Sequence, residues 1–492
     1  MTVLRVDNFA KGMNNYIGKS VLPVDIASNI VNAECSTGNL VPIKGTAYTG
    51  FDDPIKLDWH GTKDRSVAKW FNEYYWSDNV KLEYGGTKAL GITPPSSLLT
   101  ITPVTGELEG NYKYCYTYVM DGWESAPFTE GATIWYTSIK LSKQTGSFTL
   151  PSSYPKTITH IRVYRTIAED FTFYLIGEYD KTNEGKTITD TISDLDLGLH
   201  PVIDSLNNFP PPQKGKFLTE NEGVFYLAID NKLYMSQISN PHAWNRGNWV
   251  GVKDTITGIA STYQGILIFT NNSTTKLLGN TIATLFVQNV PDTMGCPNWR
   301  TISKISNFPI WVSNDGICLF DGQNILLVSY QKITMPKQII CGETANDVYY
   351  LFHDTGVVCF DYRNNQSFRL LDIKCDYCWY DGIRNKFYLQ LYNNEIHEFG
   401  AGENLTVYYE SGWLSESELT YKNFRKLKVY SEGEVRIIFD VEDETIMDKY
   451  IKGNGWKQLF LPVSTGRYCV LKLQSNHLIT EFMLDFEQQM QN

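Results

Sequence analysis

Hydrophobic and polar positions along the chain form a recurring hairpin pattern. Each copy has an aromatic or β-branched run, a turn of two to four polar residues, and a second apolar run. Because Asn, Asp and Gly tolerate the positive φ angles of tight turns, each copy predicts two antiparallel strands. Five clear copies have turns centred near residues 230, 271, 315, 355 and 393.

The spacing of these hairpins predicts a β-propeller. Consecutive turns are 41, 44, 40 and 38 residues apart, and a period of about 40 residues with one aromatic hairpin is typical of a four-stranded blade. Two earlier hairpins, near residue 78 and, more weakly, near residue 37, are 41 residues apart. We therefore expect six or seven blades. Strands from both ends of the array should complete the ring, because an open array leaves an exposed sheet edge.

A second domain is expected inside the propeller. The turns near 78 and 230 are 152 residues apart, and removing residues 93–205 leaves 39. This segment begins at the breaker ITPP and ends before the Pro-rich NNFPPPQKGK, as linkers do. Several short alternating strands within about 110 residues predict an immunoglobulin-like or fibronectin-like β-sandwich.

The hairpin period stops after Gly400, and strand-like runs about ten residues apart follow. No segment shows a sustained helical period. The sequence thus predicts an all-β chain. Residues 1–92 and 206–400 form the propeller, 93–205 the inserted sandwich, and 401–492 a small C-terminal β platform domain.

Charge and cysteine usage narrow the function. A net charge of −11 argues against a protein that grips nucleic acid, because neutralising phosphates requires an excess of Lys and Arg. No apolar run approaches the length of a membrane span. The nine cysteines are scattered and mostly lie in apolar runs, which is typical of buried thiols in a reducing cytoplasm.

Cys375 and Cys378 form the only CxxC motif. A zinc site needs about four ligands, and no second cysteine or histidine pair has metal-ligand spacing. On a strand, positions three apart point to opposite faces. We therefore expect buried thiols here and no metal site.

Other candidate chemistry is equally weak. The seven histidines are dispersed, and a nucleophile elbow, a P-loop and a strand-linked GxGxxG are absent. Ser313-Asn314-Asp315-Gly316 begins like a sialidase Asp-box but lacks its later Gly and Trp. The sequence predicts a non-enzymatic protein without catalytic, cofactor-binding or metal-binding residues.

Two acidic groups are interpreted as solvated surfaces, which is the usual role of charge clusters. The first is a predicted hairpin tip, and the second is the exposed side of a terminal strand. They comprise Asp440, Glu442, Asp443, Glu444 and Asp448, and Asp190, Asp194 and Asp196.

The order of the parts resembles a known family. GNYKYCYTYVMDGWESAPF (110–128), HIRVYRT and TDTISDLDLG resemble the fibronectin type III-like insert of bacteriophage tail propellers. LYMSQISNPHAWN (233–245), KLLG and GCPNWRTISKISNFPIWVSNDGICLFDG (295–322) resemble their blades. YKNFRKLKVYSEG and FLPVSTGRY resemble their C-terminal platform domain. The chain is thus similar to the tail tubular, or nozzle, proteins of short-tailed phages.

This resemblance implies a structural protein of the virion tail, assembled in the host cytoplasm. Such proteins commonly form a homohexameric ring below the portal and adaptor, continue the DNA channel, and help to retain and release the genome. The implied partners are further copies of the chain, the adaptor, tail fibre or other tail proteins and, transiently, genomic DNA. The alternatives are a glycan-binding or carbohydrate-active propeller at the virion surface and a monomeric scaffold.

Overall fold

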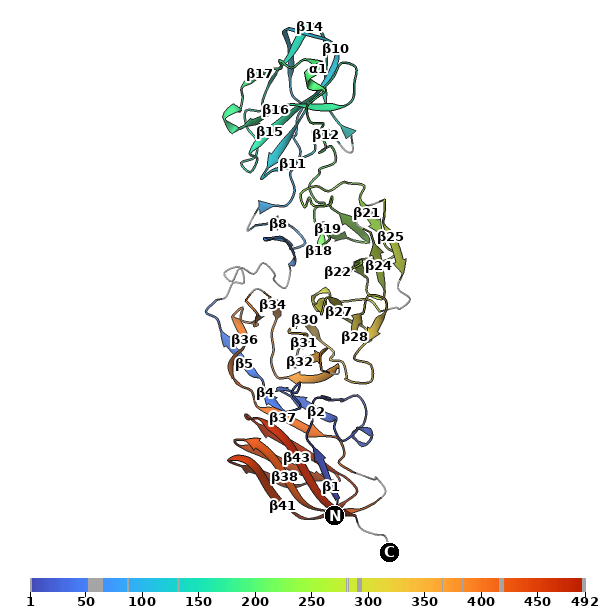
Figure 1. Ribbon diagram of the computed structural model, residues 1–492, viewed down its shortest axis with the longest axis vertical. Helices are drawn as coiled ribbons and strands as arrows, with labels where there is room; N and C mark the ends of the chain where they lie inside the picture. Colours follow the sequence, from blue (N-terminus) through green and yellow to red (C-terminus); the bar gives the residue numbers. More distant parts are fainter. Residues whose placement is uncertain are drawn as a thin grey trace. The chain divides into compact units, whose positions relative to one another are not determined.

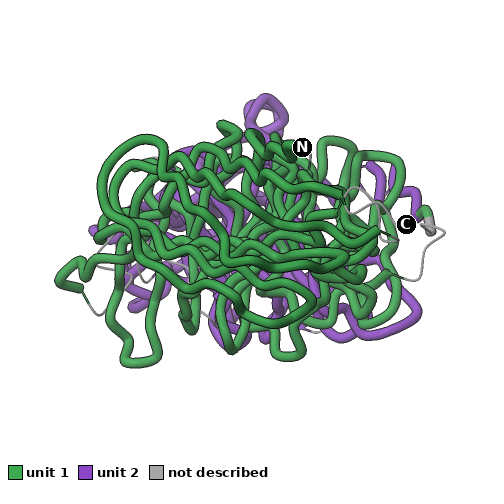
Figure 2. Tube along the Cα trace, turned by 90° about the horizontal axis from the view of Figure 1, so that it is seen from below, with its two compact units in different colours: residues 1–63, 262–276, 288–492 green, residues 64–261, 277–287 purple. Residues whose placement is uncertain are grey.

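The computed structural model of the chain describes residues 2–51, 65–85, 88–130, 133–279, 281, 283–289, 294–364, 366–382, 384–415 and 420–488 (Figure 1). Contacts divide the chain into two compact units (Figure 2). One unit comprises residues 1–63, 262–276 and 288–492, and the other comprises residues 64–261 and 277–287.

A four-stranded antiparallel sheet recurs along the chain. In the second unit, one such sheet consists of β6 (Ser66–Trp70), β7 (Glu73–Ser77), β8 (Leu82–Tyr84) and β9 (Lys88–Ala89), and another of β18 (Lys216–Asn221), β19 (Val224–Ile229), β20 (Lys232–Met235) and β21 (Trp249–Gly251). A further sheet of the same kind consists of β22 (Gly258–Thr262), β23 (Gly265–Phe269), β24 (Thr274–Leu278) and β25 (Phe286–Asn289).

The first unit repeats the same arrangement. One sheet consists of β26 (Ser303–Ile305), β27 (Phe308–Ser313), β28 (Gly316–Phe320) and β29 (Ile325–Leu327). The next four strands, β30 (Ile339–Ala345), β31 (Val348–His353), β32 (Gly356–Asp361) and β33 (Ser367–Leu371), pair in the same order and form one side of a nine-stranded sheet. The last contains β34 (Tyr377–Asp381), β35 (Lys386–Gln390), β36 (Ile396–Asn404) and, from the N-terminal part of the chain, β5 (Lys44–Tyr48).

The predicted hairpins occupy the same position in every one of these sheets. Six of them, near residues 78, 230, 271, 315, 355 and 393, are the second and third strands of a run of four antiparallel strands. Their apolar runs are buried, as in β28, where every residue is buried. This repeated four-stranded meander confirms the predicted all-β propeller class.

The weak hairpin near residue 37 is different. It lies between β3 (Ala33–Glu34) and β4 (Val41–Pro42), which pair only with each other. A ladder of two short strands buries too little apolar surface to form a blade. Strand β5, further along the N-terminal part of the chain, completes a four-stranded sheet by pairing with β36 through Thr46 and Phe399.

The inserted segment forms a six-stranded sheet around one long strand, β10 (Ile101–Met120). The first part of β10 pairs with β14 (Thr137–Thr149), and its last part pairs with β15 (His160–Thr166). The sheet is completed by β11 (Trp123–Glu124), β16 (Phe173–Asp180) and β17 (Thr187–Thr189), and β12 (Thr129–Glu130) and β13 (Thr133–Ile134) form a separate ladder. Because β10 is long enough to pair with both neighbours, the strands share one hydrogen-bonded sheet.

Two sheets pack together at the C-terminal end of the chain. One has the order β1 (Thr2–Val6), β43 (Ile479–Gln488), β38 (Lys422–Glu432) and β41 (Asn454–Gly466). The other continues from β33 through β2 (Ala27–Val31), β37 (Val407–Ser411), β42 (Cys469–Ser475), β39 (Val435–Val441) and β40 (Glu444–Ile451). Leu427 and Phe482 from the first sheet and Ile437 and Leu471 from the second lie in one core.

The N-terminal strand β1 therefore pairs with the C-terminal strand β43 rather than with the propeller part expected for residues 1–92, whereas β2 lies between β33 and β37 (Figure 1). The alternation of Leu4 and Val6 toward the shared core explains why β1 is held there. Regular helical segments are short: α1 (Asp194–Leu197) and the 3-10 turns η1 (Lys19–Val21), η3 (Lys181–Asn183) and η4 (Trp299–Thr301). Among the described residues, no helix has the length and apolar character needed to cross a membrane.

Candidate functional site

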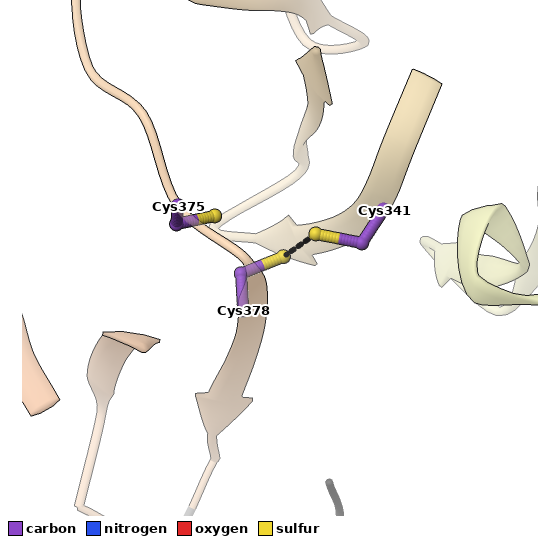
Figure 3. A group of neighbouring side chains, drawn as sticks. All are labelled: Cys341, Cys375 and Cys378. Carbon is purple, nitrogen blue, oxygen red and sulfur yellow. Dashed lines mark hydrogen bonds between the residues drawn. The ribbon is translucent and has the colours of Figure 1, made fainter. Parts of the chain in front are cut away.

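Three buried cysteines converge between two neighbouring sheets of the first unit (Figure 3). Cys341 lies on β30, Cys378 on β34, and Cys375 in the segment that leads into β34. Their sulfur atoms all lie within 4.8 Å of one another, and the Sγ atoms of Cys341 and Cys378 are 3.4 Å apart. This is the one such group of potential metal ligands found among the residues that the structure describes.

The expectation that Cys375 and Cys378 face opposite sides was wrong. Strand alternation applies only to residues within a strand, and β34 begins at Tyr377. The preceding segment turns the Cys375 side chain toward the same space as Cys378 (Figure 3). Cys341 belongs to the preceding sheet, with three strands between it and Cys375, so no local spacing motif could include it.

The electrostatics of the three thiols are coupled. Hydrogen bonds from the thiols of Cys375 and Cys378 hold the pKa of Cys341 below its usual value against the opposing effect of burial, and the charge of Arg300 acts in the same direction. Burial raises the pKa of Cys375 and that of Cys378. The proximity of the three sulfur atoms thus shifts the pKa of Cys341 in the direction opposite to that of Cys375 and Cys378.

All nine cysteines are buried and free of disulfide bonds in the structure. Outside the convergent group, burial raises the pKa of Cys35, Cys296 and Cys359 to about 12 and also raises that of Cys115 and Cys469. A thiol that remains protonated is a poor nucleophile and a poor metal ligand. Cys341 therefore differs from these cysteines in the direction of its pKa shift, and the convergent group differs from them in the proximity of its three sulfur atoms.

A buried ion network lies in the insert. The side chains of Arg165 and Asp190 are both inaccessible to solvent, and Arg165 also pairs with Asp194 at 2.8 Å. Burial raises the pKa of Asp190, and the charge of Arg165 opposes this shift. Asp190 was expected on an exposed strand face. It is buried instead because Arg165, on β15, reaches it from within the sheet.

The network borders a hollow of about 450 Å³. Its lining includes Thr105, Leu108 and Tyr112 from β10 and Asp190 and Asp194 from the segment after β17. The Tyr112 hydroxyl donates to Asp194 at 3.1 Å. The carboxylates of Asp190 and Asp194 are therefore bound by Arg165 and Tyr112 of the same chain, and these contacts stabilise the insert.

The acidic group at residues 440–448 includes a hairpin tip, as predicted. Glu442 and Asp443 have positive φ angles and connect β39 to β40. Asp440, however, is buried and pairs with Lys472 at 2.8 Å. Asp448 pairs with Arg436 at 2.7 Å. The tip is solvated, but the carboxylates at its base take part in ion pairs.

Ser313-Asn314-Asp315-Gly316, the segment that begins like an Asp-box, forms the turn between β27 and β28. Ser313 is buried, and its hydroxyl donates to the carbonyl of Gly316 and accepts the N–H of Asp315. Hydrogen bonds of this kind stabilise ordinary polar turns, so they account for this segment without a catalytic role.

One histidine lies at the junction between the insert and the blade-type sheets of the second unit. The Nδ1 atom of His242 accepts the N–H of Gly91 at 3.1 Å. The His242 ring packs 4.7 Å from that of Tyr84 and 5.6 Å from that of Trp123. Burial lowers the pKa of His242 to about 4. The ring is therefore a neutral packing element that fixes the linker.

No protein-family model and no curated protein matches the chain. Among solved structures, BamB from Moraxella catarrhalis is 10% identical with a TM-score of 0.29, covering 73% of this chain and 99% of that one. Apo AztD from Citrobacter koseri is 8% identical with a TM-score of 0.28, covering 72% and 99%. Hsv2 from Kluyvelomyces marxianus is 9% identical with a TM-score of 0.28, covering 73% and 94%. Similarities this low carry no information about function.

Proposed function

We propose that this chain is a structural component of a short-tailed phage tail, a nozzle or tail-tube ring that continues the DNA channel below the portal and adaptor. The observation that carries the proposal is the order of the parts. Four-stranded sheets are interrupted by the insert between β9 and β18 and followed by a C-terminal two-sheet domain. The phage tail propellers that the sequence resembles have the same order.

An exposed apolar edge supports assembly into a ring. Strand β41 is the edge strand of its sheet, and Trp456, Phe460 and Val463 on it are exposed to solvent. Exposed apolar side chains on an edge strand favour association with another chain. In a homohexamer, the exposed side of β41 or an equivalent surface would contact the neighbouring copy of the chain. The same kind of surface could contact the adaptor or another tail protein.

Electron microscopy of the purified chain, alone and mixed with adaptor protein, tests the proposal. We expect hollow rings with six-fold symmetry, in which each subunit is one chain of 56.2 kDa. A monodisperse particle of 56.2 kDa under every condition would contradict it. Release of oligosaccharide from a host surface polysaccharide would favour the carbohydrate-active alternative.

A pair of variants tests the edge. Phe460→Glu places a charge on β41 and should weaken ring formation while leaving the circular dichroism spectrum unchanged. Phe171→Glu, at an exposed aromatic residue of the insert, is the matched control and should assemble like the unaltered chain. If both variants form rings equally well, β41 is not part of the interface between subunits.

A further inference from the structure

The convergence of Cys341, Cys375 and Cys378 has the dimensions of a metal site. Tetrahedral zinc with Zn–S bonds of about 2.3 Å separates its sulfur ligands by about 3.8 Å. The 3.4 Å between Cys341 and Cys378, and the 4.8 Å limit for all three sulfurs, bracket this value. A disulfide would bring two sulfurs to about 2.05 Å. The three sulfurs can therefore surround one ion with small side-chain adjustments.

The charge of the surroundings favours a divalent ion. Three thiolates around a divalent cation leave a single negative charge, which is costly to bury alone. The positive charge of Arg300 acts on Cys341 from η4 and offsets this excess. A monovalent ion would leave two negative charges against the same arginine. Thiolate ligands are soft and suit zinc rather than magnesium or calcium.

We propose that Cys341, Cys375 and Cys378 bind one Zn²⁺ ion through their three thiolates, with the fourth position open to a small ligand. The three thiols lose their protons on binding. The ion ties β30 to β34 and so links the sheet β30–β33 to the sheet that contains β5. Its role is structural. The inference does not depend on the function proposed above.

Metal analysis of the full chain tests this inference. The protein is purified under reducing conditions from zinc-supplemented cells, and bound zinc is measured by mass spectrometry and by release with a mercurial reagent. We expect about one Zn²⁺ per chain. Replacement by Co²⁺ should give a sulfur-to-cobalt charge-transfer band. Such a band would not arise from histidine or carboxylate ligands alone.

Variants locate the ion. Cys375→Ala and Cys378→Ala should each lower zinc content and the Co²⁺ band by about tenfold or more. Cys359→Ala is the matched control, because Cys359 is buried in the same hydrophobic core but lies outside the convergent group. It should retain both signals. Equal loss or equal retention in all three variants would overturn the proposal.

Two further measurements keep the test decisive if the variants fold poorly. Chelation of the unaltered protein should lower its thermal midpoint, and added Zn²⁺ should restore it. Alkylation of the chelated, denatured and unreduced protein should label all nine cysteines. A metal-free unaltered protein with nine reactive thiols overturns the proposal, as does a protein in which two thiols are blocked as a disulfide.

Discussion

Arg165 and Asp190 form an ion pair 2.8 Å long in which neither side chain is accessible to solvent. Removing one partner from such a pair leaves an unpaired buried charge. We therefore expect Arg165→Met to destabilise the insert by about 3 to 5 kcal/mol. Urea unfolding followed by circular dichroism measures this change.

The double variant Arg165→Met/Asp190→Leu separates the effect of the unpaired buried charge on stability from the effect of lost packing. Because it removes both charges, it should recover part of the loss. Asp194, which also pairs with Arg165, is partly exposed and can be hydrated. A double variant less stable than Arg165→Met would mean that packing, rather than the buried charge, dominates.

His242 should make the stability of the second unit depend on pH. The pKa of His242 in the folded chain, about 4, lies below the ordinary value of 6.5. Between these pH values, the imidazole is protonated in the unfolded chain and neutral in the folded chain. Stability is therefore lost as pH falls from 6.5 toward 4, by up to about 3 kcal/mol. Urea midpoints near pH 7 and pH 4.5 measure the loss. In His242→Gln the pH-dependent loss should be smaller, and an unchanged slope would contradict this account.

The indole ring of Trp311 is enclosed by the protein interior. It is fully buried, packs 4.8 Å from the Phe269 ring, and donates to the carbonyl of Gly295 at 3.0 Å. Trp311→Ala should destabilise by about 3 to 5 kcal/mol, through lost burial and the cavity left behind. Tyr350→Ala should cost less, about 2 kcal/mol, because Tyr350 is only half-buried. Thermal unfolding of the two variants provides the comparison.

Gly91 holds the linker into the insert. Its φ angle is +84°, and a Cβ atom there would lie 2.4 Å from Cδ of Pro211. Gly91→Ala should therefore destabilise by about 2 to 4 kcal/mol from backbone strain and overlap. Gly122→Ala is the control: φ is +85° but nothing lies within 4 Å of the added atom. Thermal midpoints should fall further for Gly91→Ala than for Gly122→Ala.

A DNA conduit should let its cargo slide. Each chain has a formal charge of −11, so a six-fold ring would carry −66 (6 × −11), and affinity for DNA grows with each neutralised phosphate. We expect weak or no duplex binding by the purified chain in a gel-shift titration at about 150 mM salt. Submicromolar binding would indicate a DNA-holding role instead.

Hairpin positions could be predicted because they depend on local chemistry. The turn after β19 needs a positive φ, which Asp230 adopts, and an apolar run directly precedes it in the sequence. The destination of β1 could not be predicted in the same way. Val6 pairs with Phe482, and the pattern of β1 fits any apolar sheet face equally well.

The candidate metal site shows the same limit. The CxxC spacing of Cys375 and Cys378 was visible in the sequence, but the third ligand lies on a different sheet. A strand boundary just after Cys375 decided the direction of its side chain. Sequence reasoning likewise placed Asp190 on a surface, because the partner that buries it, Arg165, lies on an earlier strand of the insert.

The sheet that contains β5 cannot be completed until the residues around His397 have been synthesised. Tyr48, near the start of the chain, pairs with His397, which follows most of the propeller in sequence. At about 5 to 20 residues per second, a ribosome needs roughly 20 to 70 seconds to synthesise the intervening chain. During that time β5 has no β36 to pair with, and an unpaired strand is prone to pair with other chains. A chaperone that shields β5 during synthesis should therefore raise the yield of folded protein.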